Sequence, residues 1–251
     1  MDNFLVKHRP IIFEDVVGHE EAKDKLKNII QAGLLPAGLL LSGTFGIGKS
    51  TEAKLTARAL LCQKRRPGTF SPCNECGSCK SKSHSGNFIE RNCAKLTTEQ
   101  IESDIISYLV FQVIYYDEFQ RAKIPLQEML LKALEGDPYP LNKLFIFSTT
   151  DPGKVDEGLL QRVLHLKLLP PSVQQLIPWL EKICNLESIP IEDKSALSLI
   201  AEECKCIPRV CLNFLFYHCI LGGEPISRRI IEKATRIDGT GRERITPKTV
   251  F

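Results

Sequence analysis

The sequence predicts an α/β fold: a parallel sheet flanked by helices, followed by a small helical domain. Short apolar runs, separated by polar and helical stretches, are the first observation, and such runs are typical of buried parallel strands. They cover residues 38–42, 88–89, 113–116, 144–147 and 163–168. The pair Pro170-Pro171 is the second, because neither a helix nor a central strand continues through two prolines. The third is that only helical patterns follow this pair.

The prolines give the domain organisation. Residues 1–169 are expected to form the sheet domain, and residues 170–237 the helical domain. Within the latter, helices are expected near 173–184, 191–204 and 209–221, with 227–236 as a weaker candidate. Residues 238–251 combine glycine, proline and charge with little to bury, so a flexible tail is expected.

Composition excludes several classes of protein. Of the 251 residues, 43% are hydrophobic, which is enough for a buried core. The 33 basic and 30 acidic residues leave a formal charge of +3, too small for a polycation that coats nucleic acid. No apolar run approaches the roughly 20 residues of a membrane span, and the first ten residues lack the apolar stretch of a secretory signal. A cytoplasmic protein with reduced thiols is therefore expected.

The first strand leads into a glycine-rich turn and then a helix. Residues 43–50 read GTFGIGKS and match the phosphate-binding P-loop, in which glycines turn backbone N–H groups toward phosphate oxygens. Lys49 is expected to reach the outer phosphates of a nucleotide, and the Ser50 hydroxyl to bind Mg²⁺. The alternative is a plain glycine-rich turn. The predicted nucleotide-binding residues here are Gly43, Thr44, Gly46, Ile47, Gly48, Lys49, Ser50 and Thr51.

The strand at 113–116 ends in Asp117-Glu118. Nucleotide hydrolysis needs a carboxylate near the metal and another that activates water. Asp117 is therefore predicted to hold Mg²⁺ through water, and Glu118 to polarise the attacking water. The alternative is that both residues only cap the next helix.

Four cysteines follow the P-loop helix with the spacing of a zinc site. Cys62, Cys73, Cys76 and Cys79 read C-x10-C-x2-C-x2-C, and two-residue gaps allow successive thiolates to turn onto one tetrahedral ion. Four thiolates leave no open position, so a structural Zn²⁺ is predicted, with idle buried thiols as the alternative. Cys204 and Cys211, seven residues apart, are instead expected to belong to the core of the helical domain.

The combination resembles the gamma/tau clamp-loader ATPases of bacterial DNA polymerase III, in the AAA+ superfamily. Zinc-ligand spacing directly after a P-loop helix is one part of the resemblance. The opening residues 7–20, KHRPIIFEDVVGHE, are similar to the family's KxRPxxFxDVVGxE. Residues 130–135 (LLKALE) resemble the helix after the acidic element, and 147–152 (FSTTDP) resemble the sensor 1 strand end. The similarity covers nearly the whole chain.

Several roles are implied by the resemblance alone. Val17 would line the base pocket, and Thr150 would contact the γ-phosphate as sensor 1. Arg162 matches the arginine that relatives insert into a neighbouring subunit's site, although its neighbours differ; the alternative is a surface ion pair. Arg209 matches the sensor 2 arginine of the helical lid, again with different neighbours.

The resemblance also implies partners. These are the delta and delta-prime subunits, further gamma/tau copies, a sliding clamp, and primed DNA contacted through its phosphates; no membrane is expected. The segment before Asp117 is shorter than in relatives, so DNA contact is less strongly implied than ATP binding. Only thirty residues follow Leu221, too few for the family's collar domain, so the chain is expected to assemble without its own collar or to be a truncated form.

The main expectation is thus an ATP-hydrolysing clamp-loader subunit that uses ATP, Mg²⁺ and a structural Zn²⁺. A stator or scaffold subunit of the delta-prime kind, with little or no catalysis, is the alternative. A AAA+ ATPase outside replication that kept the zinc module is a third. Basic residues after position 227 make the C-terminal part positively charged, which would suit contact with DNA phosphates. The alternative is that these residues belong only to a solvated helix face and tail.

Overall fold

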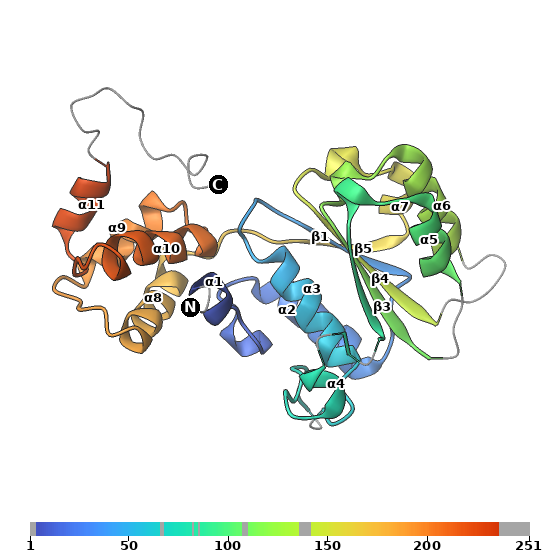
Figure 1. The fold of residues 1–251 in the computed structure, drawn as a ribbon, viewed down its shortest axis with the longest axis horizontal. Coiled ribbons are helices and arrows are strands. Elements are labelled where there is room, and N and C mark those ends of the chain that lie inside the picture. Colours follow the sequence, from blue (N-terminus) through green and yellow to red (C-terminus); the bar gives the residue numbers. More distant parts are fainter. Residues whose placement is uncertain are drawn as a thin grey trace. The chain divides into compact units, whose positions relative to one another are not determined.

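The computed structural model describes residues 4–65, 68–81, 83–84, 86–106, 110–135 and 142–235. The chain divides into two compact units (Figure 1). The sheet unit contains residues 10–16 and 20–168, and the helical unit contains residues up to 9, 17–19 and those from 169 onward. The predicted flexible tail, 238–251, lies outside the described residues.

The sheet unit is built on five parallel strands, which confirms the predicted fold class. Their order in the sheet is β2-β3-β4-β1-β5. The register places Ser42 beside Thr149, and Asn92 beside Asp117. The carboxyl ends of parallel strands therefore meet at one edge. The strands are β1 (Gly38–Ser42), β2 (Phe88–Asn92), β3 (Gln112–Asp117), β4 (Lys143–Thr149) and β5 (Val163–Lys167).

Helices cover both faces of this sheet, as Figure 1 shows. The sheet unit contains α2 (Glu20–Ala32), α3 (Lys49–Leu60), α4 (Gly77–Lys80), α5 (Thr98–Ile105), α6 (Ile124–Leu134) and α7 (Glu157–Leu160). Alternate residues of a strand point to opposite faces. Val113 and Tyr115 accordingly join one core with α2 and α3, whereas Ile114 and Tyr116 join a second core with α5, α6 and α7.

Single helical turns connect several of these elements. They are η1 (Phe13–Asp15), η2 (Cys93–Lys95), η3 (Phe119–Arg121) and η4 (Pro152–Lys154). Two of them, η3 and η4, directly follow the carboxyl ends of β3 and β4. They form part of the sheet edge at which the predicted site residues lie.

The helical unit contains α1 (Phe4–Lys7), α8 (Val173–Leu186), α9 (Ser195–Glu203), α10 (Pro208–Phe214), a π-helical continuation η5 (Leu215–Ile220) and α11 (Arg228–Thr235). The start of α8 follows from its sequence: Ser172 and Gln175 form a reciprocal capping box directly after the two prolines. The beginning of this helix matches the predicted residue.

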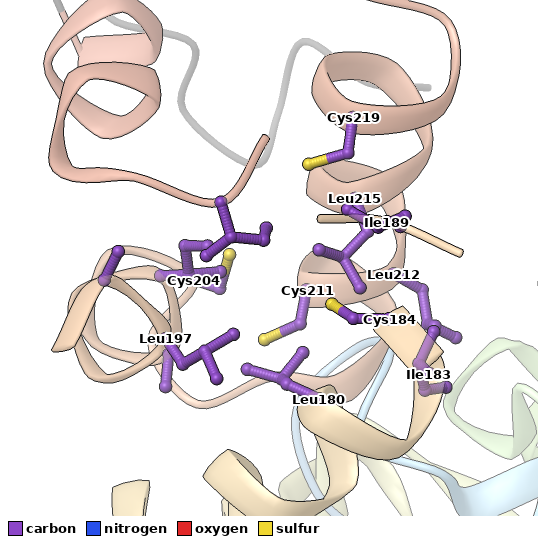
Figure 2. Packing of buried hydrophobic residues seen from close by; sticks show 14 of the residues in the cluster. Leu180, Ile183, Cys184, Ile189, Leu197, Cys204, Cys211, Leu212, Leu215 and Cys219 are labelled. Atoms are coloured by element: carbon purple, nitrogen blue, oxygen red, sulfur yellow. The ribbon is translucent and has the colours of Figure 1, made fainter. Parts of the chain in front are cut away.

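Buried cysteines are part of this unit's core. Figure 2 shows Cys184, Cys204, Cys211 and Cys219 among leucine and isoleucine side chains. Cys204 and Cys211 do not share one helix, however, because Lys205 and Cys206 adopt positive φ angles of 52° and 54° and form a turn between α9 and α10. The two cysteines reach one core through the packing of these helices rather than through helical periodicity.

The N-terminal residues differ from the predicted division at residue 169. Residues 4–9 belong to the helical unit, because Phe4 is buried in its core and stacks on Phe216 with ring centroids 5.4 Å apart. His8 Nε2 lies 2.7 Å from Glu187 Oε1. These contacts join segments that are 179 or more residues apart in sequence, which local sequence patterns do not report. Within the described part of the chain, no helix has the length and apolar character needed to cross a membrane.

Candidate nucleotide and metal sites

The P-loop lies between β1 and α3 and has the backbone that glycine permits. Gly43, Gly46 and Gly48 have φ angles of 155°, 81° and 119°. A Cβ atom on Gly43 would lie 2.6 Å from the carbonyl oxygen of Leu168, too close for any other residue. The turn therefore keeps its backbone accessible just before the N-terminus of α3, an arrangement suited to an anion.

Lys49 is the first residue of α3 and is almost fully buried. Its Nζ donates hydrogen bonds to the carbonyl oxygens of Gly43, at 2.8 Å, and Thr44, at 3.0 Å. The ammonium group is thus folded back over the same turn that would hold phosphates. These residues fit the β- and γ-phosphates of a nucleotide, which a lysine at this position neutralises.

Asp117 stands at the end of β3 and is held by three hydrogen bonds to one oxygen. The Tyr115 hydroxyl donates to its Oδ1 at 2.7 Å, the Ser148 hydroxyl at 2.5 Å and the Glu118 N–H at 3.1 Å. Among the described residues, no hydrogen bond is made to Oδ2. The side chain of Ser50, the other predicted Mg²⁺ ligand, lowers the pKa of the Tyr115 hydroxyl. This geometry fits Mg²⁺, which prefers oxygen ligands and keeps several waters.

Burial raises the pKa of Tyr115, and the charge of Asp117 raises it further. The hydroxyl therefore remains a protonated donor at neutral pH. Tyr116 points to the other face of the sheet and donates to Asp104 at 2.9 Å, and Asp104 also accepts two hydrogen bonds from Arg91. The two adjacent tyrosines thus each donate a hydrogen bond to a carboxylate, and they do so on opposite faces of one strand.

Glu118 follows in a left-handed conformation, with φ 56° and ψ 45°. This conformation is costly for a residue with a side chain, by roughly 1–3 kcal/mol, and such strain clusters at functional sites. Gln120 Nε2 donates to Glu118 Oε2 at 2.6 Å, and Arg121 Nε lies 3.7 Å from the same oxygen. Glu118 is therefore oriented by side chains, and it does not simply cap a helix: η3 has no side-chain cap at this position.

Gln120 connects Glu118 to the end of β4. Its Oε1 accepts hydrogen bonds from the Thr149 hydroxyl at 2.9 Å and from the Thr150 N–H at 3.3 Å. Thr149 is buried, whereas Thr150, the predicted sensor 1 residue, is exposed just beyond the strand. The predicted pair Glu118 and Thr150 is thus joined by one amide side chain that sequence patterns did not single out.

The remaining predicted nucleotide contacts come from other elements of the chain. Arg162, between α7 and β5, donates to the Gly158 carbonyl at 2.9 Å and to Glu135 Oε1 at 2.6 Å. Val17 and Arg209 belong to the helical unit. Val17 packs against its hydrophobic core, and Arg209 is the second residue of α10 and is half-buried. The roles of these three residues stay predictions.

The four predicted zinc ligands come together. The Sγ atoms of Cys62, Cys73, Cys76 and Cys79 all lie within 4.8 Å of one another, and those of Cys73 and Cys79 are 4.0 Å apart. Tetrahedral zinc with Zn–S bonds of about 2.3 Å would place its sulfurs about 3.8 Å apart. Across the described residues, this is the one group of three or more potential metal ligands of this kind. The set therefore fits a structural zinc ion.

Backbone hydrogen bonds favour a thiolate at two of these four cysteines, whereas burial raises the pKa of Cys62 and raises that of Cys79 to about 12. The N–H groups of Glu75 and Cys76 lie 3.4 and 3.3 Å from Cys73 Sγ and lower the pKa of Cys73. Burial opposes ionisation of Cys76, but N–H groups of Cys79 and Gln63 bring its pKa to about 6. N–H donors to sulfur are the outer contacts that hold a thiolate ready for metal.

The cysteine module is attached to two other parts of the sheet unit. Arg58, on α3, donates to Asn74 at 2.7 Å. Ser71 accepts from the Phe13 N–H at 3.0 Å and donates to Glu14 at 2.5 Å. The module therefore links the P-loop helix to the opening segment, and a metal ion there would stabilise contacts beyond its own ligands.

We predict that Cys76→Ser removes the metal and destabilises the sheet unit by several kcal/mol, because structural zinc contributes folding free energy. Cys93→Ser is the matched control, since both cysteines are 3% exposed but Cys93 lies in an apolar core. Purified wild type and Cys93→Ser should each contain close to one zinc per chain. A chelator should lower the melting temperatures of these two proteins and leave that of Cys76→Ser unchanged. Less than a tenth of an equivalent in the wild type would contradict a zinc site.

Three residues of the site escaped sequence reasoning: Tyr115, Gln120 and Ser148. A period of two along a strand places residue 115 on the face of Asp117, which was a usable signal for Tyr115. No local pattern indicates Ser148 or Gln120, because their contacts cross from β4 to β3 and from η3 to β4. Pairing of distant strands creates them.

Comparison with known proteins agrees with this geometry. A family model described as "DNA polymerase III, delta subunit" matches residues 18–172, more than half of the chain. The tau subunit of DNA polymerase III from Escherichia coli K12 is 34% identical over 205 residues, which are 78% of this chain and 31% of the relative. The gamma subunit from Buchnera aphidicola of Acyrthosiphon pisum is 31% identical over 225 residues, 86% of this chain and 61% of the relative. The chain thus spans about a third to three fifths of these relatives.

Solved structures with the same fold include the RuvB Holliday junction branch migration motor of Thermotoga maritima. It has a TM-score of 0.69 at 20% identity, covering 96% of this chain and 76% of that one. A point variant of the same RuvB gives a TM-score of 0.70 with the same coverage. At this identity the likeness establishes the fold, that of AAA+ P-loop proteins. From the family match and its tau and gamma relatives, we conclude that the chain belongs to the DNA polymerase III delta subunit family.

Proposed function

We propose that this chain is an ATP-binding and ATP-hydrolysing subunit of a DNA polymerase III clamp loader, which sets a sliding clamp on primed DNA during replication. The observation that carries the proposal is the set of three hydrogen bonds that orient Asp117 at the carboxyl end of β3, the sheet edge at which the P-loop follows β1. The phosphate turn and the acidic pair thus lie at one edge of the sheet, as hydrolysis of a nucleotide would require. The similarity to tau and gamma subunits supports the clamp-loader context.

Each residue has a role in this proposal. Lys49 and the backbone of the P-loop hold the phosphates, while Ser50 and Asp117 hold Mg²⁺, which would offset the charge on the transferred phosphoryl group. Glu118 accepts the proton of the attacking water. Thr150, tied to Glu118 through Gln120, is the residue that responds to the γ-phosphate.

We predict that Lys49→Ala weakens binding of a fluorescent ATP analogue at least about tenfold and lowers phosphate release to background. Lys49 supplies a buried positive charge beside the phosphates, and its loss leaves the P-loop itself with only neutral backbone donors. Wild-type chain that releases phosphate no faster than Lys49→Ala, even with clamp, primed DNA and partner subunits present, would refute the enzymatic proposal. Thermal melting of both proteins controls for folding.

A scaffold subunit of the same complex is the second candidate. The match to a family model described for the delta subunit favours it. The presence of Lys49, Ser50, Asp117 and Glu118 argues against it, since a scaffold has no need of them. Stable assembly with partner subunits, together with ATP turnover below detection, is the result that would favour the scaffold.

A further inference from the structure

The Tyr115 hydroxyl lies against two polar side chains at the edge of the sheet. It donates to Asp117 Oδ1 at 2.7 Å and lies 2.9 Å from Ser148 Oγ. The rest of this side chain is fully buried in the core beneath α3. A buried hydroxyl requires a partner, but the apolar environment of the ring would be equally well filled by phenylalanine.

The hydrogen bonds to Asp117 are concentrated on one of its two oxygens. Three donors meet Oδ1, from Tyr115, Ser148 and the Glu118 N–H. A carboxylate held in this way has a fixed plane and rotamer, which leaves Oδ2 to face a cation or its water. Outer hydrogen bonds of this kind orient metal ligands, and their loss commonly costs 10- to 100-fold in metal affinity.

We propose that Tyr115 is a positioning residue for the Mg²⁺ of the nucleotide site, fixing the carboxylate of Asp117 through its hydroxyl group. The inference rests on the proposed nucleotide-binding function and adds a residue that acts through a predicted ligand. The hydroxyl makes no direct contact with the ion in this role. It preorganises the site, so that less freedom is lost when the metal binds.

The neighbouring tyrosine provides a matched control. Tyr116 is as fully buried, and its hydroxyl also donates to a carboxylate, at 2.9 Å from Asp104 Oδ2. It lies on the opposite face of β3, in the core with α5 and α6. Tyr115→Phe and Tyr116→Phe therefore delete the same group from the same strand, and both remove one buried hydrogen bond to a carboxylate.

The test is metal binding by the full chain in the presence of a non-hydrolysable ATP analogue. Mg²⁺ is titrated while binding of the fluorescent analogue is followed, and Mn²⁺ bound in the same site is counted by electron paramagnetic resonance. We expect Tyr115→Phe to raise the half-saturating metal concentration about tenfold, with analogue affinity in EDTA within twofold of wild type. Tyr116→Phe should change neither value, although it should lower the melting temperature. Ser148→Ala, which removes another donor to Oδ1, should shift metal binding in the same direction as Tyr115→Phe.

Three outcomes would overturn the inference. If the half-saturating metal concentration is unchanged in Tyr115→Phe, the Tyr115 side chain contributes only to core packing. Equal shifts in both phenylalanine variants mean that general loosening of the sheet is responsible. A wild-type chain that binds no analogue with or without Mg²⁺ refutes the proposed nucleotide site itself, a result distinguishable from the other two because the wild type already fails.

Discussion

Glu118→Gln is expected to lower the rate of ATP hydrolysis by about 10² to 10⁴, the usual contribution of a positioned general base. This corresponds to roughly 3 to 5 kcal/mol of transition-state stabilisation. The amide has the shape of the carboxylate, and its oxygen can still accept the hydrogen bond from Gln120 Nε2, which spans 2.6 Å in the wild type. Affinity for the ATP analogue should therefore stay within a few-fold of wild type.

The measurement is steady-state phosphate release at saturating ATP, with clamp, primed DNA and partner subunits present. Glu128→Gln is the control, because it makes the same chemical change at an exposed position of α6 in the same unit. A Glu118→Gln rate within threefold of wild type would show that another group activates the water. Lost nucleotide binding would show instead that Glu118 supports the fold of the site.

Arg162→Ala is expected to lower hydrolysis in the assembled complex by about 10³ to 10⁵, the range for an arginine supplied to phosphoryl transfer from another subunit. Within the chain, Arg162 pairs with Glu135 at 2.6 Å, and both side chains are well exposed. Such a surface pair contributes only about 0–1 kcal/mol, so it can be exchanged for a contact with a neighbouring subunit. The melting temperature of the variant should accordingly change little.

Mixing two inactive variants tests whether the arginine acts between subunits. An Arg162→Ala chain keeps its own Glu118, and a Glu118→Gln chain keeps an arginine to donate. Assemblies formed from the two together should regain a substantial fraction of the wild-type rate, which neither variant shows alone. If the mixture stays inactive, or if Arg162→Ala hydrolyses ATP normally in the complex, Arg162 is a surface residue paired with Glu135 and nothing more.

Local patterns were sufficient for the framework of the molecule. Apolar runs predicted the positions of all five strands. The three central strands, β1, β3 and β4, are buried along almost their whole length, and such strands need continuous apolar residues. The edge strands β2 and β5 are only partly buried. Residues 43–50 predicted a turn that only glycine can adopt, now seen in the φ angles of Gly43, Gly46 and Gly48. The spacing of Cys62, Cys73, Cys76 and Cys79 predicted a cluster because the ligands are close in sequence as well as in space.

Only the tertiary structure could decide contacts between distant segments. The division at residue 169 missed that Phe4 and Val17 pack with the helical unit. Sequence reasoning also missed the hydrogen bonds from Ser148 to Asp117 and from Thr149 to Gln120, whose partners are 31 and 29 residues apart. The physical reason is that hydrophobic periodicity and turn chemistry act within about ten residues, whereas the register of β3 against β4 sets which polar side chains meet. The sequence determined which groups are available, and the pairing of strands determined which of them touch.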